Sequence, residues 1–427
     1  MEDDPRLAEV EGGARRLSRR GALALGTAGL ATCLTAGAGL VAARSGGPRP
    51  PAAGTGPGSG APAGPFAPGP ARDILANRAR AVRDGDRTAF LATVGSAPAA
   101  VQDAQARLYD NLRRLPLDSW EERLSAVESD SADAAVVRVE LRYQLRGFDR
   151  GQVQRTRRLT LAPRSGAWVI VGAGAGGDDA DFWDGAPLRA VRGRSSLVIG
   201  DAPELAEISR RLDAAVPAVT GVVGKGWARR AVALVPAGAA QAAALAGPRQ
   251  NLREIAALAT RAPGAAGGRG EDRIIISPGT FGRLNSLGRD VVLTHELTHV
   301  ATGGAGDTRT PLWLIEGFAD YVGYRRAEVD VRAAAGELRR DLVAGRLPAA
   351  LPGREAFAGT SPRLSQAYQE AWLACRMISD RYGEATLVRL YRAAGHAPEA
   401  TALRDVLGLT RDRLTAMWRD YLKKELR

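Results

Sequence analysis

Histidine, cysteine and lysine are scarce in this chain of 427 residues. The two cysteines, Cys33 and Cys375, lie far apart, which excludes a disulfide framework. Lysine occurs only at Lys225, Lys423 and Lys424, so the formal net charge of +12 comes from arginine. The length allows two or three domains, each with its own hydrophobic core.

The arginines are spread along the chain, and aromatic residues make up only 5% of it. A nucleic-acid groove needs basic side chains interleaved with aromatic ones, and no such patch occurs. We therefore expect no nucleic-acid partner. The abundance of arginine, alanine, glycine and proline is typical of a protein from a GC-rich bacterial genome.

The N-terminal region has the pattern of a membrane anchor. Residues 1–20 end in RRLSRR, and the 23 residues of segment 21–43 carry no charge. Such a segment can span a bilayer, with the basic residues 1–20 held in the cytoplasm. We expect a single-pass protein whose later domains are extracytoplasmic. A cleaved, twin-arginine-like export signal is the alternative, and LATC, ending at Cys33, weakly resembles a lipidation motif.

Two folded regions are expected after a Pro/Gly-rich linker at residues 44–70. Residues 71–180 begin with helical patterns, and the strand-like segments AVVRVELRYQLRG, VQRTRRLTLAP and GAWVIVGAG follow them. This helix-then-antiparallel-sheet order resembles the cone-shaped α+β fold of the nuclear transport factor two superfamily. The resemblance implies an accessory domain without a catalytic site.

A polar, Gly-rich break at residues 173–188 separates this region from a second one, residues 188–427. There SSLVIG, ARRAVALVP and DRIIISP predict strands, and QAAALAG and NLREIAALA predict helices. The fold class is therefore α+β, with a mixed sheet followed by a helical C-terminal part. DRIIISP, just before the histidine segment described next, is expected to offer its edge to an extended peptide.

The segment VVLTHELTHV holds two of the three histidines of the chain, His295 and His299; the third is His396. Its apolar residues have helical spacing, and positions i and i+4 lie on one face of a helix. Both imidazoles can therefore reach one metal ion. Glu296 lies about 100° further round the helix axis, a position that suits a general base. The HExxH pattern is short, so a second element has to support it.

The segment TPLWLIEGFADYVGY, residues 310–324, provides that element. Glu316 lies in a mainly apolar run where an unpaired carboxylate would be costly, which favours a role as the third ligand. Asp320 is one turn further on the same face and can accept a hydrogen bond from a histidine ligand, fixing its tautomer.

HELTH followed by WLIEGFADY resembles the gluzincin zinc metallopeptidases. The resemblance implies a zincin-like domain, Zn²⁺ bound by His295, His299 and Glu316, Glu296 as the base, and a peptide or protein substrate. Sixteen residues separate His299 from Glu316, fewer than in the best-known gluzincins. A metzincin would have a third histidine where this chain has Ala305, so the metzincin family is excluded. No GAMEN motif precedes His295, so the sequence gives no support for an aminopeptidase.

The same resemblance suggests a tyrosine that stabilises the oxyanion, and Tyr368 in LSQAYQEAWLACRMISDRYG is the candidate. His396, in a polar turn, is the alternative donor. A rival reading of the whole chain is a non-catalytic envelope protein that uses the zinc-bound fold as a structural or binding scaffold.

Overall fold

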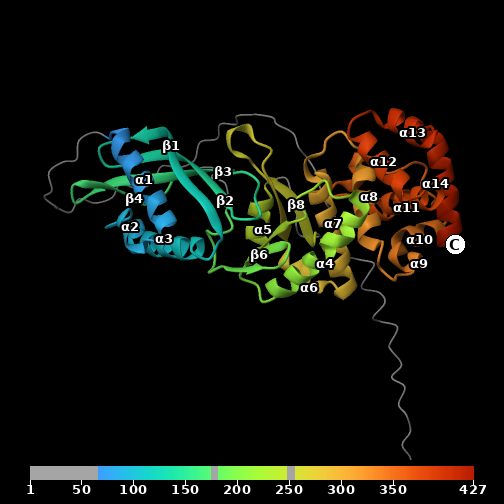
Figure 1. Cartoon of the computed structure of the whole chain (residues 1–427), viewed down its shortest axis with the longest axis horizontal. Helices are drawn as coiled ribbons and strands as arrows, with labels where there is room; N and C mark the ends of the chain where they lie inside the picture. The colour runs from blue at the N-terminus through green and yellow to red at the C-terminus, as the bar shows by residue number, and fades with distance from the viewer. Residues whose placement is uncertain (1–65, 175–180, 248–254) are drawn as a thin grey trace, which may run out of the picture.

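The computed structural model describes residues 66–174, 181–247 and 255–427 (Figure 1). Within these residues the fold is α+β, as the sequence predicts. The predicted cytoplasmic segment 1–20, the predicted anchor 21–43 and nearly all of the linker 44–70 lie outside the described residues. None of the helices in the described ranges is both long and apolar enough to cross a membrane.

The N-terminal part consists of helices that pack against an antiparallel sheet of order β1-β2-β3-β4 (Figure 1). The helices are α1 (Pro68–Asp84), α2 (Arg87–Ala92) and α3 (Ala99–Leu112). The strands are β1 (Leu117–Asp130), β2 (Ala135–Leu145), β3 (Val153–Arg164) and β4 (Ala167–Ala173).

The sequence predicts β2, β3 and β4 and misses β1. Strand β1 is rich in charged side chains, and of its residues only Trp120 is buried. Its hydrophobic alternation is therefore too weak to indicate a strand. Pairing along the whole of β2 stabilises it instead.

The second part contains a mixed five-stranded sheet of order β5-β6-β7-β9-β8. Strands β6, β7 and β9 run parallel, whereas β5 and β8 are antiparallel to their neighbours. The elements are β5 (Arg189–Arg192), β6 (Ser196–Gly200), α4 (Leu205–Val223), β7 (Ala231–Val235), α5 (Ala239–Ala246), β8 (Ala257–Ala262) and β9 (Glu271–Ile276).

Two sequence-based predictions about this sheet are wrong. NLREIAALA was predicted as a helix, but Ala257, Leu258 and Ala259 belong to β8, because pairing with β9 overrides the helical propensity of alanine. DRIIISP does form β9, but β9 lies between β7 and β8. The edge that could pair with a peptide is therefore that of β8.

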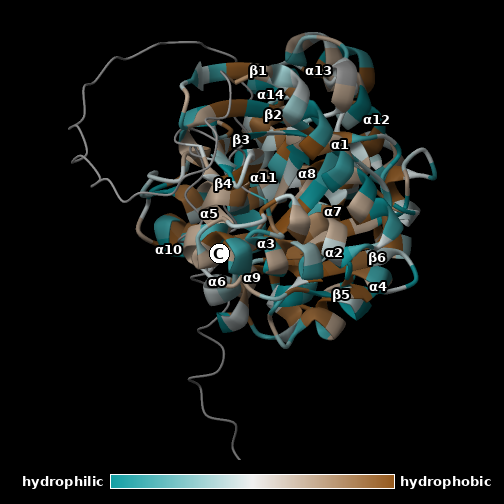
Figure 2. Cartoon of the chain, turned by 90° about the vertical axis from the view of Figure 1, so that its left-hand side faces the viewer, coloured by the Kyte–Doolittle hydropathy of each residue, from teal (hydrophilic) through white to brown (hydrophobic). Residues whose placement is uncertain are grey.

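The remaining chain is helical and lies on the side of this sheet away from the N-terminal part (Figure 1). Many of these helices carry both hydrophobic and hydrophilic residues (Figure 2), whereas α7 and α8 are buried on all sides over residues 291–299 and 312–320. The helices are α6 (Pro278–Arg283), α7 (Ser286–Thr302), α8 (Leu312–Tyr324), α9 (Val331–Ala334), α10 (Gly336–Val343), α11 (Leu364–Tyr382), α12 (Glu384–Ala394), α13 (Glu399–Leu407) and α14 (Arg411–Leu426).

The two parts share a buried interface. Phe182 and Trp183 pack against Tyr143 of β2, and one hydrophobic cluster joins them to residues of β6 and β7. Across the same interface Arg273 of β9 forms an ion pair of 2.8 Å with Asp149, and both side chains are almost fully buried. Part of the predicted polar break at 173–188 thus packs into the core, and the two parts are held firmly together.

One buried carboxyl in the helical part predicts a pH dependence of stability. Burial raises the pKa of Glu370 on α11 to about 7, although Arg363 lies 3.0 Å away. The folded state therefore holds this proton more tightly than the unfolded state, so stability falls as pH rises from 4.5, the ordinary pKa, towards 7. Glu370→Gln should remove this loss, at most about 3 kcal/mol. Urea unfolding of wild type and Glu370→Gln at pH 4.5 and pH 7 measures the free energy of unfolding. An equal change with pH in the two proteins would contradict the prediction.

Candidate metal centre

Helix α7 carries both histidines of the HExxH pattern and has clear ends. Asn285 caps its N-terminus by accepting a hydrogen bond of 2.8 Å from the Gly288 amide. Gly303, with φ of 74°, ends it in the left-handed region that favours glycine. His295, Glu296 and His299 are all buried on this helix. The local sequence thus fixes the helix that presents the site.

The short connection to α8 is tight, as its glycines suggest. A 3-10 turn, Gly304–Gly306, follows α7 directly. Asp307 then accepts hydrogen bonds from the amides of Arg309 and Thr310, at 2.8 Å and 3.1 Å. Pro311 precedes the first residue of α8. Sixteen residues therefore suffice to bring Glu316 back to the histidines.

Two glycines of α8 let the helices of the site approach closely. A Cβ on Gly317 would lie 2.3 Å from the carbonyl oxygen of Ala371 on α11. A Cβ on Gly323 would lie 3.1 Å from the carbonyl oxygen of Val291 on α7. The sequence alone predicts no role for either glycine, because nothing in the local pattern shows which neighbouring backbone comes near.

The three predicted ligand atoms converge. His295 Nε2 and His299 Nε2 lie 3.0 Å apart, and they lie 3.3 Å and 3.4 Å from Glu316 Oε2. A tetrahedral zinc ion with ligands at about 2.0–2.1 Å holds neighbouring ligand atoms about 3.3 Å apart. Metal sites in proteins are built from histidine, cysteine and acidic side chains. Among the described residues, His295, His299 and Glu316 form such a group with a spacing suited to a metal ion.

The surroundings of Glu316 also fit a metal. Its side chain is fully buried, and within the described ranges neither carboxylate oxygen has a hydrogen-bond partner. Burial works against ionisation, but the facing His299 and His295 keep the pKa of Glu316 below its ordinary value. A buried, ionised carboxylate that lacks hydrogen bonds is costly unless a cation balances it. The donor set of two imidazoles and a carboxylate matches zinc.

Glu296 lies near the two histidines and also contacts the sheet. Its Oε2 accepts a hydrogen bond of 2.6 Å from the Ala259 amide of β8, whereas Oε1 has no partner among the described residues. Burial raises the pKa of Glu296, although the neighbouring histidines lower it. One oxygen is thus held in place, and the other remains able to accept a proton.

Asp320 orients one of the histidines. Its Oδ1 lies 2.7 Å from Nδ1 of His295, so His295 Nε2 is left facing Glu316 and His299. Burial opposes protonation of the ring, but Asp320 raises the pKa of His295 well above its ordinary value. This arrangement fixes the ring and makes Nε2 the stronger ligand when the ring is neutral.

Asp320→Asn should therefore weaken zinc binding without unfolding the chain. Carboxylates that orient histidine ligands typically contribute about 10–100-fold to metal affinity. Competition with a chromophoric chelator measures the dissociation constant, and circular dichroism checks the fold. An unchanged constant would show that Asp320 is only a packing residue.

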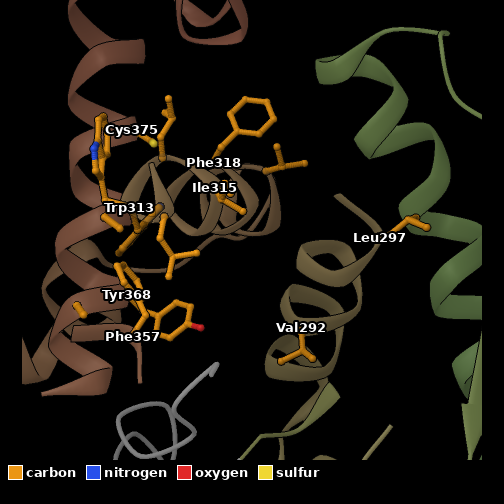
Figure 3. Packing of buried hydrophobic residues seen from close by; sticks show 14 of the residues in the cluster. Val292, Leu297, Trp313, Ile315, Phe318, Phe357, Tyr368 and Cys375 are labelled. Carbon is orange, nitrogen blue, oxygen red and sulfur yellow. The ribbon is translucent and has the colours of Figure 1, made fainter. Parts of the chain in front are cut away.

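The structure brings Tyr368 near the trio and leaves His396 outside it. The rings of Tyr368 and His295 have their centroids 6.3 Å apart, and Tyr368 packs edge-on against Phe357. Figure 3 shows the Tyr368 ring beside Phe357, with its oxygen directed away from α11. His396 is exposed in the turn after α12. Of the two candidate donors, Tyr368 is therefore the better placed.

Tyr391 of α12 also lies near the site, although its sequence context does not predict this. Its hydroxyl donates to Thr302 Oγ1 at 3.2 Å, and its ring packs on Phe318, two residues after Glu316. A Cβ on Gly304 would touch both His299 Nδ1 at 2.9 Å and the Tyr391 hydroxyl at 3.3 Å. Only the small residue at this position lets Tyr391 lie so close to the second histidine.

The whole centre is deeply buried. Relative exposure is 0% for His295, Glu296 and Glu316, 1% for His299 and 2% for Asp320. Burial strengthens electrostatic interactions within the site because water is excluded. It also means that a peptide can reach these groups only after some rearrangement of the residues that cover them.

Comparisons with known proteins give a distant likeness of fold. No protein-family model matches the chain, and no curated protein matches it. Among solved structures it is similar to an M1 zinc metallopeptidase from Deinococcus radiodurans, solved as a mutant with a bound Tyr-Ser-Ala substrate. The identity is 15%, the TM-score is 0.31, and the match covers 72% of this chain and 69% of that chain. Similarity at this level carries no conclusion about activity.

Proposed function

We propose that the protein is a zinc-dependent peptidase of the gluzincin type. The observation that carries the proposal is the mutual spacing of His295 Nε2, His299 Nε2 and Glu316 Oε2, at 3.0–3.4 Å. The described residues supply three protein ligands, and a catalytic zinc site keeps its fourth position for water or substrate. Glu296, beside the trio but engaged with β8, supplies the base that such a site needs.

The bound zinc would supply an acidified water and polarise the carbonyl of the peptide. Glu296 takes the proton of the attacking water on Oε1, because its Oε2 stays hydrogen-bonded to the Ala259 amide. It then delivers that proton to the leaving amine. Asp320 holds the ring of His295, and the hydroxyl of Tyr368 donates to the developing oxyanion.

A second function is favoured by one observation, the near-complete burial of the centre. In that case the metal would be structural, and the fold would serve as a scaffold or binding surface. Structural zinc sites usually have four protein ligands, however, and the described residues gather three.

Purified full-length protein distinguishes the two functions. The peptidase proposal predicts one zinc ion per chain, cleavage of casein or a peptide library, loss of cleavage with a chelator and recovery with zinc. A structural site predicts bound zinc without cleavage at any substrate concentration. Cleavage that persists after complete removal of zinc would contradict both.

We further propose that the peptidase works outside the cytoplasmic membrane, anchored by residues 21–43. The support is the uncharged run of that segment and the arginines that precede it. Fractionation of cells that express the tagged full chain tests this. Recovery of the full-length protein from the soluble cytosolic fraction would refute it.

A further inference from the structure

A polar groove lies at the C-terminal end of the histidine helix. Two cavities, of about 460 Å³ and about 580 Å³, adjoin there and share Gly226, Trp227, Arg269 and residues 301–303. Four segments line the groove: the loop before β7, the β8–β9 hairpin, the end of α7 and helix α12. Residues 150–152 of the N-terminal part reach its first cavity.

The groove lies close to the proposed catalytic centre. Tyr391 and Phe318 line its second cavity, and Thr302 lines both. A Cβ on Gly304 would lie 2.9 Å from His299 Nδ1 and 3.3 Å from the Tyr391 hydroxyl. The second histidine therefore lies close to a residue that lines the groove.

The acidic side chains of the groove already have partners. Asp272 binds Arg261 at 3.0 Å and also Arg269 at 3.5 Å. Glu271 accepts hydrogen bonds of 2.9 Å from the amides of Arg150 and Gly151. Asp307, in the second cavity, accepts hydrogen bonds from the amides of Arg309 and Thr310. Glu271 and Asp307 keep their negative charge, but the arginines that line the groove outnumber its carboxylates.

Three groove arginines lack a carboxylate partner in the part of the chain that the structure describes. Arg230 donates to the carbonyl oxygen of Gly147, and Arg392 donates to that of Val223 at 2.7 Å. Arg150 forms no ion pair with a described residue. All three are exposed, so their guanidinium groups can turn towards a ligand in the groove. The excess of arginine over carboxylate in the groove favours an anionic occupant.

The edge of β8 connects the groove to Glu296. The Ala259 amide, hydrogen-bonded to Glu296, points away from β9. Alternate residues of a strand present their amides and carbonyls to the same edge, so Arg261 faces the same way and lines the groove. Because Glu296 already occupies the Ala259 amide, an extended peptide beside Glu296 would pair with the outward backbone groups of Arg261, next to the groove.

The chain itself limits how far such a peptide can follow the edge. Beyond Arg261 the start of β3 takes the place of a peptide: the Gln154 amide donates to Pro263 at 2.9 Å, and the Ala265 amide donates to Gln152 at 3.0 Å. A peptide must leave the sheet there, where the arginine side chains remain as partners.

We infer that this groove is a specificity site for the acidic side chains of an extended peptide substrate. The inference rests on the proposed function for its link to cleavage, but the binding itself can be measured separately. Guanidinium groups pair with carboxylates in a bidentate geometry, which suits glutamate and aspartate.

The test is binding of a fluorescein-labelled, glutamate-rich peptide to the full-length Glu296→Gln variant, followed by anisotropy. A matched peptide carries glutamine at the same positions. The acidic peptide should bind about tenfold more tightly at low salt, and high salt should shrink the difference. The added substitutions Arg230→Gln and Arg392→Gln should abolish most of the preference. The control pair Arg80→Gln and Arg107→Gln removes the same charge from exposed helix positions. It should leave the preference for the acidic peptide unchanged.

Equal affinity for the two peptides would overturn the inference. An equal loss of the preference in the Arg80→Gln, Arg107→Gln control would also overturn it. A single-stranded oligonucleotide of the same charge that displaces the peptide at a lower concentration would also overturn it. If the acidic peptide binds through the arginines but the wild-type protein cleaves nothing, the proposed function fails and the site stands. If both peptides are cleaved with the same KM, the specificity site fails and the peptidase stands.

Discussion

Glu296→Gln is expected to abolish hydrolysis while leaving zinc bound. Glutamine has the same shape, and its amide oxygen can still accept the hydrogen bond from the Ala259 amide that holds Glu296 in place. It cannot take a proton at neutral pH, so the attacking water loses its base. Loss of a positioned base typically lowers kcat by about 10²–10⁴-fold.

The measurement is kcat on a cleaved peptide, together with zinc content by mass spectrometry. Glu328→Gln is the matched control, since Glu328 is exposed and lies after α8, away from the trio. A Glu296→Gln variant that keeps wild-type kcat would remove Glu296 from the mechanism. A variant that loses its zinc would instead place Glu296 among the ligands.

Glu316→Gln is expected to remove the ability of zinc to stabilise the fold. Wild-type protein should gain stability with zinc, by about 4 kcal/mol when free zinc exceeds the dissociation constant about 1,000-fold. The variant replaces a charged ligand by a weak neutral one and should lose most of that gain. Without zinc the variant should be slightly less stable than wild type, because it loses the attraction of His295 and His299 that keeps the pKa of the Glu316 carboxylate low.

Thermal unfolding with and without zinc separates these effects, and Glu328→Gln again serves as the control. An equal zinc-dependent rise in Tm for wild type and Glu316→Gln would exclude Glu316 as a ligand. A large loss of stability of the variant without zinc would indicate that Glu316 is a structural residue instead.

The convergence of the three candidate ligands was predictable because it depends largely on local periodicity. A separation of four residues on a helix places His295 and His299 on one face whatever surrounds them, and the structure keeps that helix. Glu316 and Asp320 share a face for the same reason. Their approach to the histidines required only that the intervening glycine-rich segment be short.

The features that the sequence did not predict depend on contacts between distant segments. Strand β8 is alanine-rich, and only its pairing with β9 makes it a strand and the edge of the sheet. Gly317 and Gly323 show their purpose only beside the backbones of α11 and α7. The arginine-rich groove joins residues from both parts of the chain, and no local pattern contains that information.

The most direct test of the central claim is anomalous diffraction at the zinc absorption edge from crystals of the full-length protein grown with zinc. The account predicts one peak bonded to His295 Nε2, His299 Nε2 and one Glu316 oxygen at about 2.0–2.2 Å, with Glu296 unbound. A peak elsewhere, a fourth protein ligand, or no peak between these three side chains would contradict it.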